Sequence, residues 1–189
     1  MDQAQFASAY ALTTSIGLRP FLTLALASLA MHFGYLHPSA PFAYLGTDGA
    51  TIVLAVLAVL EFAGDKVPAV DNALHVVHFA IKPVAAALLV GSALPDPSGA
   101  GAYAAMGLGA LNALGVHTAS ATARGASTAM TLGVGNPVLS FAEDGVTVTT
   151  VVAAFVAPFL AAAFAVLVTC VLAVVAIRVF RMVARRRAR

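Results

Sequence analysis

Apolar runs long enough to cross a bilayer dominate this chain, and they restrict it to a membrane fold. Residues 148–177 contain no charged side chain, and across all 189 residues 61% are hydrophobic while only 10% are charged. A soluble domain carries roughly a quarter charged residues. A bilayer core about 30 Å thick takes about 20 apolar residues per helix. The short alternating segments of a transmembrane barrel are absent, so we predict an all-α membrane protein.

The apolar segments and the loops between them predict about six transmembrane helices in a single membrane domain, residues 1–189. The expected spans are residues 10–31, 50–63, 71–94, 102–119, 126–142 and 148–177. Gly133, Gly135 and Pro137 interrupt the fifth span, and such backbone survives at membrane depth only where it is buried or lines a cavity. If this broken fifth helix is a re-entrant loop, five spans remain and the N-terminus lies outside.

Positive charge is concentrated at the C-terminal end. Residues 178–189 are rich in arginine and directly follow an apolar run, which is typical of a cytoplasmic tail that contacts anionic lipid rather than nucleic acid. Six spans then place both termini in the cytoplasm, with Lys66 and Arg124 on the same side. The loops 32–49 and 95–101 contain no Lys or Arg and are expected outside.

An acidic motif occurs twice. Residues 59–68 read VLEFAGDKVP and residues 138–146 read VLSFAEDGV, and six positions are identical when the two are aligned without gaps. Fainter echoes link residues 17–24 with 125–132, and Lys82-Pro83 with Ala157-Pro158. These echoes indicate a duplicated unit, with repeat one at about residues 8–94 and repeat two at about 101–177. Three spans in each unit make the repeats inverted, as in many transporters.

Ionisable residues gather at these motifs and on the span that follows the first one. Glu61 and Asp65 lie one helical turn apart, while Asp71, His75, His78 and Lys82 share one face of the next predicted helix. Carboxylates and imidazoles suit a divalent cation, and they equally suit proton transfer. A structural alternative is that the acids cap helix ends in the headgroup region and bond to basic side chains.

The predicted transport or proton-coupling site is a set of ionisable residues plus one asparagine at the break of the fifth span: Glu61, Asp65, Lys66, Asp71, His78, His117, Asn136, Glu143 and Asp144. Counter-charges are expected from Arg19, Lys82 and Arg124. A bound divalent cation is the cofactor that suits this site, and Glu61, Asp65, Glu143 and Asp144 would hold it.

Residues 17–21, 61–71, His78, Lys82-Pro83, His117, Arg124 and 136–144 resemble an uncharacterised bacterial membrane family, domain of unknown function 4126. The resemblance covers nearly the whole chain and implies a multi-pass protein of the bacterial plasma (inner) membrane, without implying an activity. Residues 61–66 are also similar to the Glu-x-Gly-Asp-Lys motif of cation/proton exchangers of the Gdt1 type, which are built from two inverted three-helix units. The chain departs from that motif by one extra residue before Gly64, and by Ser140 and Gly145 in its second copy.

These observations favour a small secondary transporter or channel for a cation, with proton coupling. The alternatives are a lipid-handling protein (a flippase, or a headgroup enzyme using Glu61, Asp65 and His78) and a structural subunit of a larger complex. No phosphate-binding glycine loop and no His-Glu-x-x-His helix occurs, which disfavours an enzyme. Membrane lipid is the expected partner, and the glycine-rich span at 102–119 is compatible with a homodimer. A transporter predicts that the two motifs meet around a wet cavity, whereas a structural subunit predicts paired charges and no cavity.

Overall fold

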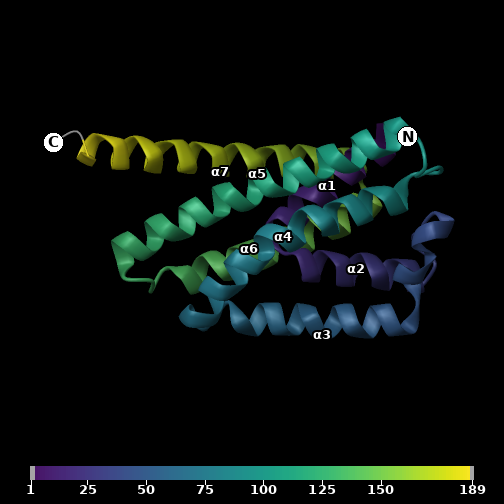
Figure 1. The fold of residues 1–189 in the computed structure, drawn as a ribbon, viewed down its shortest axis with the longest axis horizontal. Coiled ribbons are helices and arrows are strands. Elements are labelled where there is room, and N and C mark those ends of the chain that lie inside the picture. The colour runs from purple at the N-terminus through teal and green to yellow at the C-terminus, as the bar shows by residue number, and fades with distance from the viewer. Residues whose placement is uncertain (1–2, 188–189) are drawn as a thin grey trace.

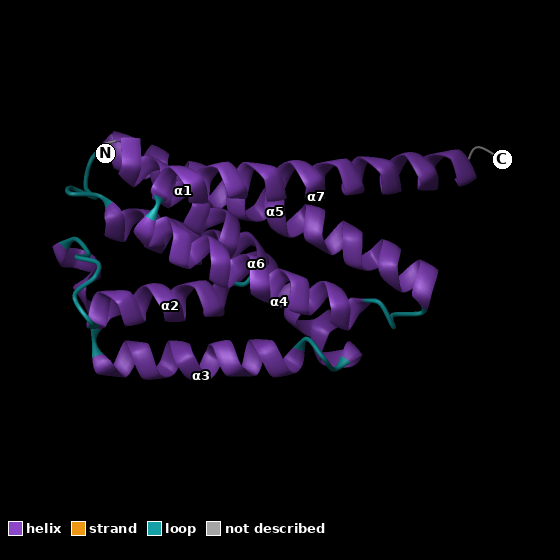
Figure 2. Cartoon of the chain, turned by 180° about the vertical axis from the view of Figure 1, so that it is seen from behind, coloured by secondary structure: helices purple, strands orange, loops and turns teal. Residues whose placement is uncertain are grey.

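A computed structural model describes residues 3–187, with the side chains of residues 68, 69, 71–73, 75, 183, 186 and 187 outside the description. Every element in the described part of the chain is a helix (Figures 1 and 2). In chain order these are α1 (Gln3–Leu18), α2 (Pro20–His32), the 3-10 helix η1 (Ala40–Gly46), α3 (Asp48–Gly64), α4 (Pro68–Ala93), α5 (Ala100–Thr131), α6 (Asn136–Val156) and α7 (Pro158–Arg187). The predicted all-α fold is confirmed.

Three of these helices are long and apolar enough to cross a membrane. They are Val76–Ala93 of α4, the whole of α6, and Pro158–Met182 of α7. A fourth span results if η1 and α3, which meet at a bend of 61°, cross as one unit. The exposed surfaces of α3 and α7 carry large aliphatic side chains, for example Val56, Leu167 and Val171, as expected for helices in contact with lipid.

The first predicted span, residues 10–31, is instead two helices. Arg19 adopts φ −133° and ψ 89° between them, and Pro20 opens α2. A residue before proline is driven out of the helical region, and proline itself has no N–H for the helix. The chain therefore turns back at this point instead of continuing as one span. Along the long axis of the molecule, α2 returns towards the end at which α1 begins (Figures 1 and 2).

The predicted boundaries of the last three spans are also wrong. Helix α5 continues through the expected loop to Thr131, and α6 runs unbroken from Asn136 to Val156. The chain turns between them at residues 132–135, where Leu132 (φ 53°) and Gly133 (φ 89°) are left-handed. Pro137 lies in the first turn of α6, where a missing N–H costs nothing. The predicted fifth span, residues 126–142, is therefore interrupted where its glycines lie, but its two halves belong to α5 and α6. The expected sixth span is divided at Ala157, before Pro158.

Helix α1 forms the centre of the bundle. It packs against α2, α4, α5, α6 and α7. Close approach depends on small residues, since a Cβ added at Gly17 would lie 2.5 Å from Val116 Cβ of α5. Ala11 and Ile16 of α1 are buried together with Ala113 of α5 and Val151 of α6. Because α1 is enclosed in this way, Arg19, which directly follows it, lies in the interior of the protein.

Candidate functional site

The Arg19 guanidinium joins the two acidic motifs. This residue is only 2% exposed. Its Nη1 pairs with Asp65 of the first motif, and its Nε lies 2.8 Å from Asp144 Oδ1 of the second. Nη2 donates to the Ser140 carbonyl oxygen at 3.0 Å and to Ser140 Oγ at 2.8 Å, and lies 3.5 Å from Glu143 Oε2. The planar guanidinium, with donors on three sides, is the side chain suited to bridging several oxygens at once.

A second cation, Lys66, follows α3 directly and contacts the same motif of α6. Its Nζ donates to Asp144 Oδ2 at 3.1 Å and to Ser140 Oγ at 2.8 Å. The ammonium also lies over two aromatic rings, 3.8 Å from the Phe62 centroid and 4.6 Å from the Phe141 centroid. The two rings pack edge to face, with centroids 5.9 Å apart. Phe62 and Phe141 occupy the same position in the two motifs, so equivalent residues are in direct contact.

Helix α5 supplies the partners of the remaining acid in the second motif. Arg124 Nη2 and Ser120 Oγ, which lie about one turn apart on α5, both donate to Glu143. Arg124 and Ser120 are buried. Glu143 thus connects α5 to α6 and, through its approach to Arg19, to the centre of the network.

Lys82 and Glu61 satisfy the backbone at the break between α1 and α2. Lys82 Nζ donates to the carbonyl oxygens of Gly17 at 2.9 Å and Leu18 at 3.0 Å, at the end of α1. Glu61 Oε2 accepts from the Leu22 N–H at 3.1 Å, in the first turn of α2. A helix carries partial negative charge at its C-terminal end and partial positive charge at its N-terminal end. Each of these two helix ends, whose backbone groups lack partners within the helix, therefore meets a side chain of the opposite charge.

The two predicted histidines extend these caps to α4 and α5. His117 Nδ1 lies 2.9 Å from Lys82 Nζ, and His78 Nε2 lies 3.4 Å from Glu61 Oε1. Both rings are buried. In the ammonium form, Lys82 can only donate, so His117 Nδ1 is the acceptor in that contact. Proton-binding groups thus lie next to both caps of the helix break.

Among the side chains that the structure describes, the charges of the network balance. Its four carboxylates are Glu61, Asp65, Glu143 and Asp144, and its four cations are Arg19, Lys66, Lys82 and Arg124. Buried charges are tolerated only when they are paired and hydrogen-bonded. The charges come from four helices (α3, α4, α5 and α6), from the α1–α2 break and from the turn after α3, so they also tie the bundle together.

The other predicted features are Asn136, one acidic and one histidine side chain of α4, and a metal site. Asn136 lies at the start of α6, where its Nδ2 donates to Thr128 Oγ1 at 2.9 Å. The side chains of Asp71 and His75 lie outside the described residues. Among the described side chains, no group of three or more His, Cys, Asp or Glu is arranged to hold a metal ion. In the described arrangement, the four acids expected to bind a divalent cation instead face protein side chains and backbone N–H groups.

The sequence interpretation missed Ser140, which is fully buried and contacts Arg19, Lys66 and Asp65. Its signal was present in the alignment of the motifs, because Ser140 occupies the position held by Glu61 in the first copy. A polar residue that replaces an acid in an otherwise apolar motif is a candidate hydrogen-bond partner for its neighbours. The backbone groups at the α1–α2 break gave no sequence signal beyond Pro20.

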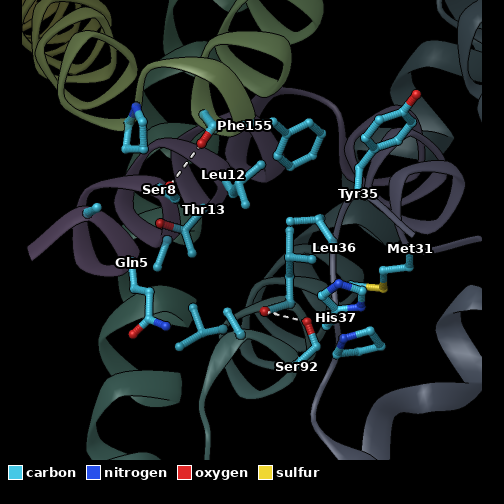
Figure 3. A pocket seen from close by; sticks show the side chains of 18 residues that line it. Gln5, Ser8, Leu12, Thr13, Met31, Tyr35, Leu36, His37, Ser92 and Phe155 are labelled. Carbon is cyan, nitrogen blue, oxygen red and sulfur yellow. Dashed lines mark hydrogen bonds between the residues drawn. The ribbon is translucent and has the colours of Figure 1, made fainter. Parts of the chain in front are cut away.

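Two cavities differ in their relation to the network. The smaller, of about 230 Å³, is lined by Leu22 of α2, Asp144 of α6, and Ala58, Val59, Glu61 and Phe62 of α3. The larger, of about 350 Å³, lies beside α1 and contains Ser8, Leu12 and Phe155 among its lining residues (Figure 3). There Ser8 Oγ donates at 2.9 Å to the carbonyl of Ala154, the oxygen that the N–H of a non-proline residue 158 would have bonded. Of these two cavities, the smaller borders the charges.

The fold and this network define an all-helical protein of membrane-like composition with a buried, charge-balanced centre. The family described as Domain of unknown function (DUF4126) matches residues 6–178, and the chain belongs to it. The match includes every member of the network. No curated protein and no solved structure matches the chain significantly. The similarity to cation/proton exchangers stays a prediction.

Proposed function

We propose that this protein is a small secondary transporter or channel for a cation, coupled to proton movement. The observation that carries the proposal is the convergence of both acidic motifs on one buried guanidinium, with Asp65 and Asp144 bound to different nitrogens of Arg19. Ionisable residues within a membrane bundle are costly, and they commonly mark ion pathways or proton relays.

Stability alone does not account for eight charges in this position. Replacing a buried ion pair with apolar residues of similar volume is often neutral or stabilising. A transport role gives the charges a use, because a cation or proton that binds Asp65 or Asp144 competes with Arg19. Occupancy of the acids then changes which partner the guanidinium holds. The break between α1 and α2 supports the same role, since transporter sites commonly form at interrupted helices.

The proposed kinship of the two motifs is supported by their contacts. Asp65 and Asp144 share Arg19, and Phe62 contacts Phe141. The first motif ends α3, whereas the second lies near the start of α6. We therefore propose that the two motifs are related by inversion, and we do not propose this relation for complete three-helix units.

For the topology, we propose that the protein lies in the bacterial plasma membrane with the arginines of α7 in the cytoplasm. The termini lie at opposite ends of the long axis (Figure 1). We further propose that α5 crosses the membrane in addition to the η1–α3 unit, α4, α6 and α7; α1 and α2 then form a re-entrant pair, and the N-terminus lies outside. This arrangement has five crossings in place of the six expected from the sequence.

A lipid-handling protein is the second candidate, and the smaller cavity favours it. Two of its lining residues, Val59 and Phe62, are exposed apolar side chains of α3. An opening between helices that is edged by apolar side chains can admit a lipid headgroup from the side. Glu61 and Asp144 would then contact the headgroup.

Ion flux in proteoliposomes tests the proposal. Wild-type protein would be reconstituted with a pH-sensitive dye inside and offered a panel of monovalent and divalent cations. Asp65→Asn and Asp144→Asn each remove one acid from Arg19, and both are expected to lose flux while remaining folded. Asp96→Asn is the matched control, because Asp96 is an exposed loop residue whose contact with the Ser98 N–H can be kept by asparagine. The absence of flux for any ion, or flux unchanged in both network variants, would contradict the proposal.

A further inference from the structure

The Lys66 ammonium occupies a compartment whose walls have the chemistry of an ammonium-binding site. Two aromatic rings, Phe62 and Phe141, contribute their faces. Asp144 contributes a carboxylate oxygen at 3.1 Å and Ser140 a hydroxyl oxygen at 2.8 Å. Aromatic rings attract cations within about 6 Å of their centroids, and recognition of ammonium ligands is a known use of such rings. The compartment thus combines cation–π attraction with two hydrogen-bond acceptors.

Among these four cations of the network, Lys66 is the one whose charged group can move out of its binding position into solvent. Its backbone lies in the turn after α3, whereas Lys82 and Arg124 project from the interiors of helices. The Lys66 side chain is 23% exposed, in contrast to 3% for the Arg19 side chain. A lysine carries its charge on a flexible four-carbon stem. Its ammonium can therefore exchange with solvent without movement of a helix.

A space for an incoming ligand lies beside this compartment. The cavity of about 230 Å³ shares two walls with it, Phe62 and Asp144. Water takes roughly 30 Å³ per molecule in the liquid, so the cavity has room for a small cation together with some of its hydration. A second carboxylate, Glu61, faces the same cavity. An ammonium group that enters there finds negative charge before it reaches the rings.

We propose that Lys66 is a tethered occupant of a binding site for a primary ammonium group, and that an external primary ammonium replaces it when Lys66 swings out. The ligand chemistry is R–NH₃⁺, from a free alkylammonium ion or from an ethanolamine lipid headgroup. This proposal rests on the proposed transport function, and it specifies a primary ammonium ion as the class of cation transported. Binding is measured without flux, so a failed flux assay and a failed binding assay are distinguishable.

The test is chemical rescue of Lys66→Ala in detergent. The variant empties the compartment, and methylammonium is the probe that refills it. We expect methylammonium to raise the melting temperature of K66A in a concentration-dependent way, by roughly 3 °C for each tenfold increase in concentration above its dissociation constant. Wild-type protein, with its own ammonium in place, is expected to respond much less. Lys66→Gln is the matched control, because its side chain leaves little room for the probe and rescue is not expected.

Competing ions and lipids decide the specificity and the source of the ligand. Sodium and tetramethylammonium at equal concentration are not expected to rescue, because neither can donate hydrogen bonds to Asp144 and Ser140. Rescue by methylammonium alone identifies a soluble cation, and rescue also by phosphatidylethanolamine nanodiscs, but not by phosphatidylglycerol, identifies a headgroup. Equal rescue by all cations, or an equal response of wild type and K66A, would overturn the proposal. It would also be overturned if K66A stays unfolded at every methylammonium concentration supplied during purification.

Discussion

Replacing Arg19 with methionine tests whether the buried guanidinium holds the bundle together. In R19M, Asp144 keeps Lys66 as a partner, whereas among the described side chains Asp65 keeps the Ser140 hydroxyl, at 3.3 Å. Removing one partner of a buried ion pair typically costs about 3–5 kcal/mol, because the other charge stays buried and unpaired. We assign that cost mainly to Asp65. Neutralising it in the double variant R19M/D65N should therefore recover part of the loss, with a coupling energy of about 1–3 kcal/mol.

The free energy of unfolding can be followed by circular dichroism in mixed micelles of a mild detergent and a denaturing one. Arg178→Met provides the matched control, since it makes the same chemical change on the exposed surface of α7. Arg19→Lys keeps the charge but loses the planar donor geometry, so an intermediate loss is expected.

Two results would refute this reasoning. If R19M costs no more than R178M, the guanidinium contributes nothing beyond a surface charge. If the costs of R19M and D65N simply add in the double variant, the two side chains are energetically independent despite their contact. Either result would remove Arg19 from the centre of the network.

The same unfolding assay checks two further predictions. Gly17→Ala should destabilise the protein by about 1–3 kcal/mol, because its Cβ would meet Val116 Cβ at 2.5 Å and an α5 carbonyl at 2.8 Å. Gly107→Ala, with nothing within 4 Å of its Cβ, should be neutral or stabilising. Equal effects of the two substitutions would contradict the close packing of α1 on α5. Lys82→Met should cost about 1–3 kcal/mol for each carbonyl it orphans, at Gly17 and Leu18, and a loss below 1 kcal/mol would show that the helix break does not depend on this cap.

The membrane class and most of the network follow from the sequence for a simple reason. Apolar composition is a property of the chain alone, and ionisable residues within apolar helices have few ways to be satisfied except by one another. Asp65, Glu143 and Asp144 pair with Arg19, Arg124 and Lys66, while Glu61 and Lys82 bind the backbone at the α1–α2 break. Burial and charge pairing together leave such residues little choice of partner.

The folding back of the chain at Arg19 does not follow from local sequence. A proline within an apolar helix reads equally well as a kink, and the choice depends on whether the freed backbone groups find partners. Those partners are Lys82 and Glu61, which lie 64 and 39 residues along the chain from the groups they bind, Leu18 and Leu22. The continuity of α5 and α6 was missed for a related reason, because small and polar residues were read as loop where tertiary packing keeps them helical.

Arg19 has a role in the charge network and a role in the backbone fold, so it links the two. Its side chain is shared by Asp65 and Asp144, while its backbone is the extended residue that separates α1 from α2. Under the proposed function, a proton or cation that neutralises either acid weakens the hold on the guanidinium. Because the same residue forms the helix break, a change in its side-chain partners acts directly on the angle between the two helices. The helix ends remain bound by Lys82 and Glu61, so the movement would be a hinge at Arg19 with its flanking caps in place.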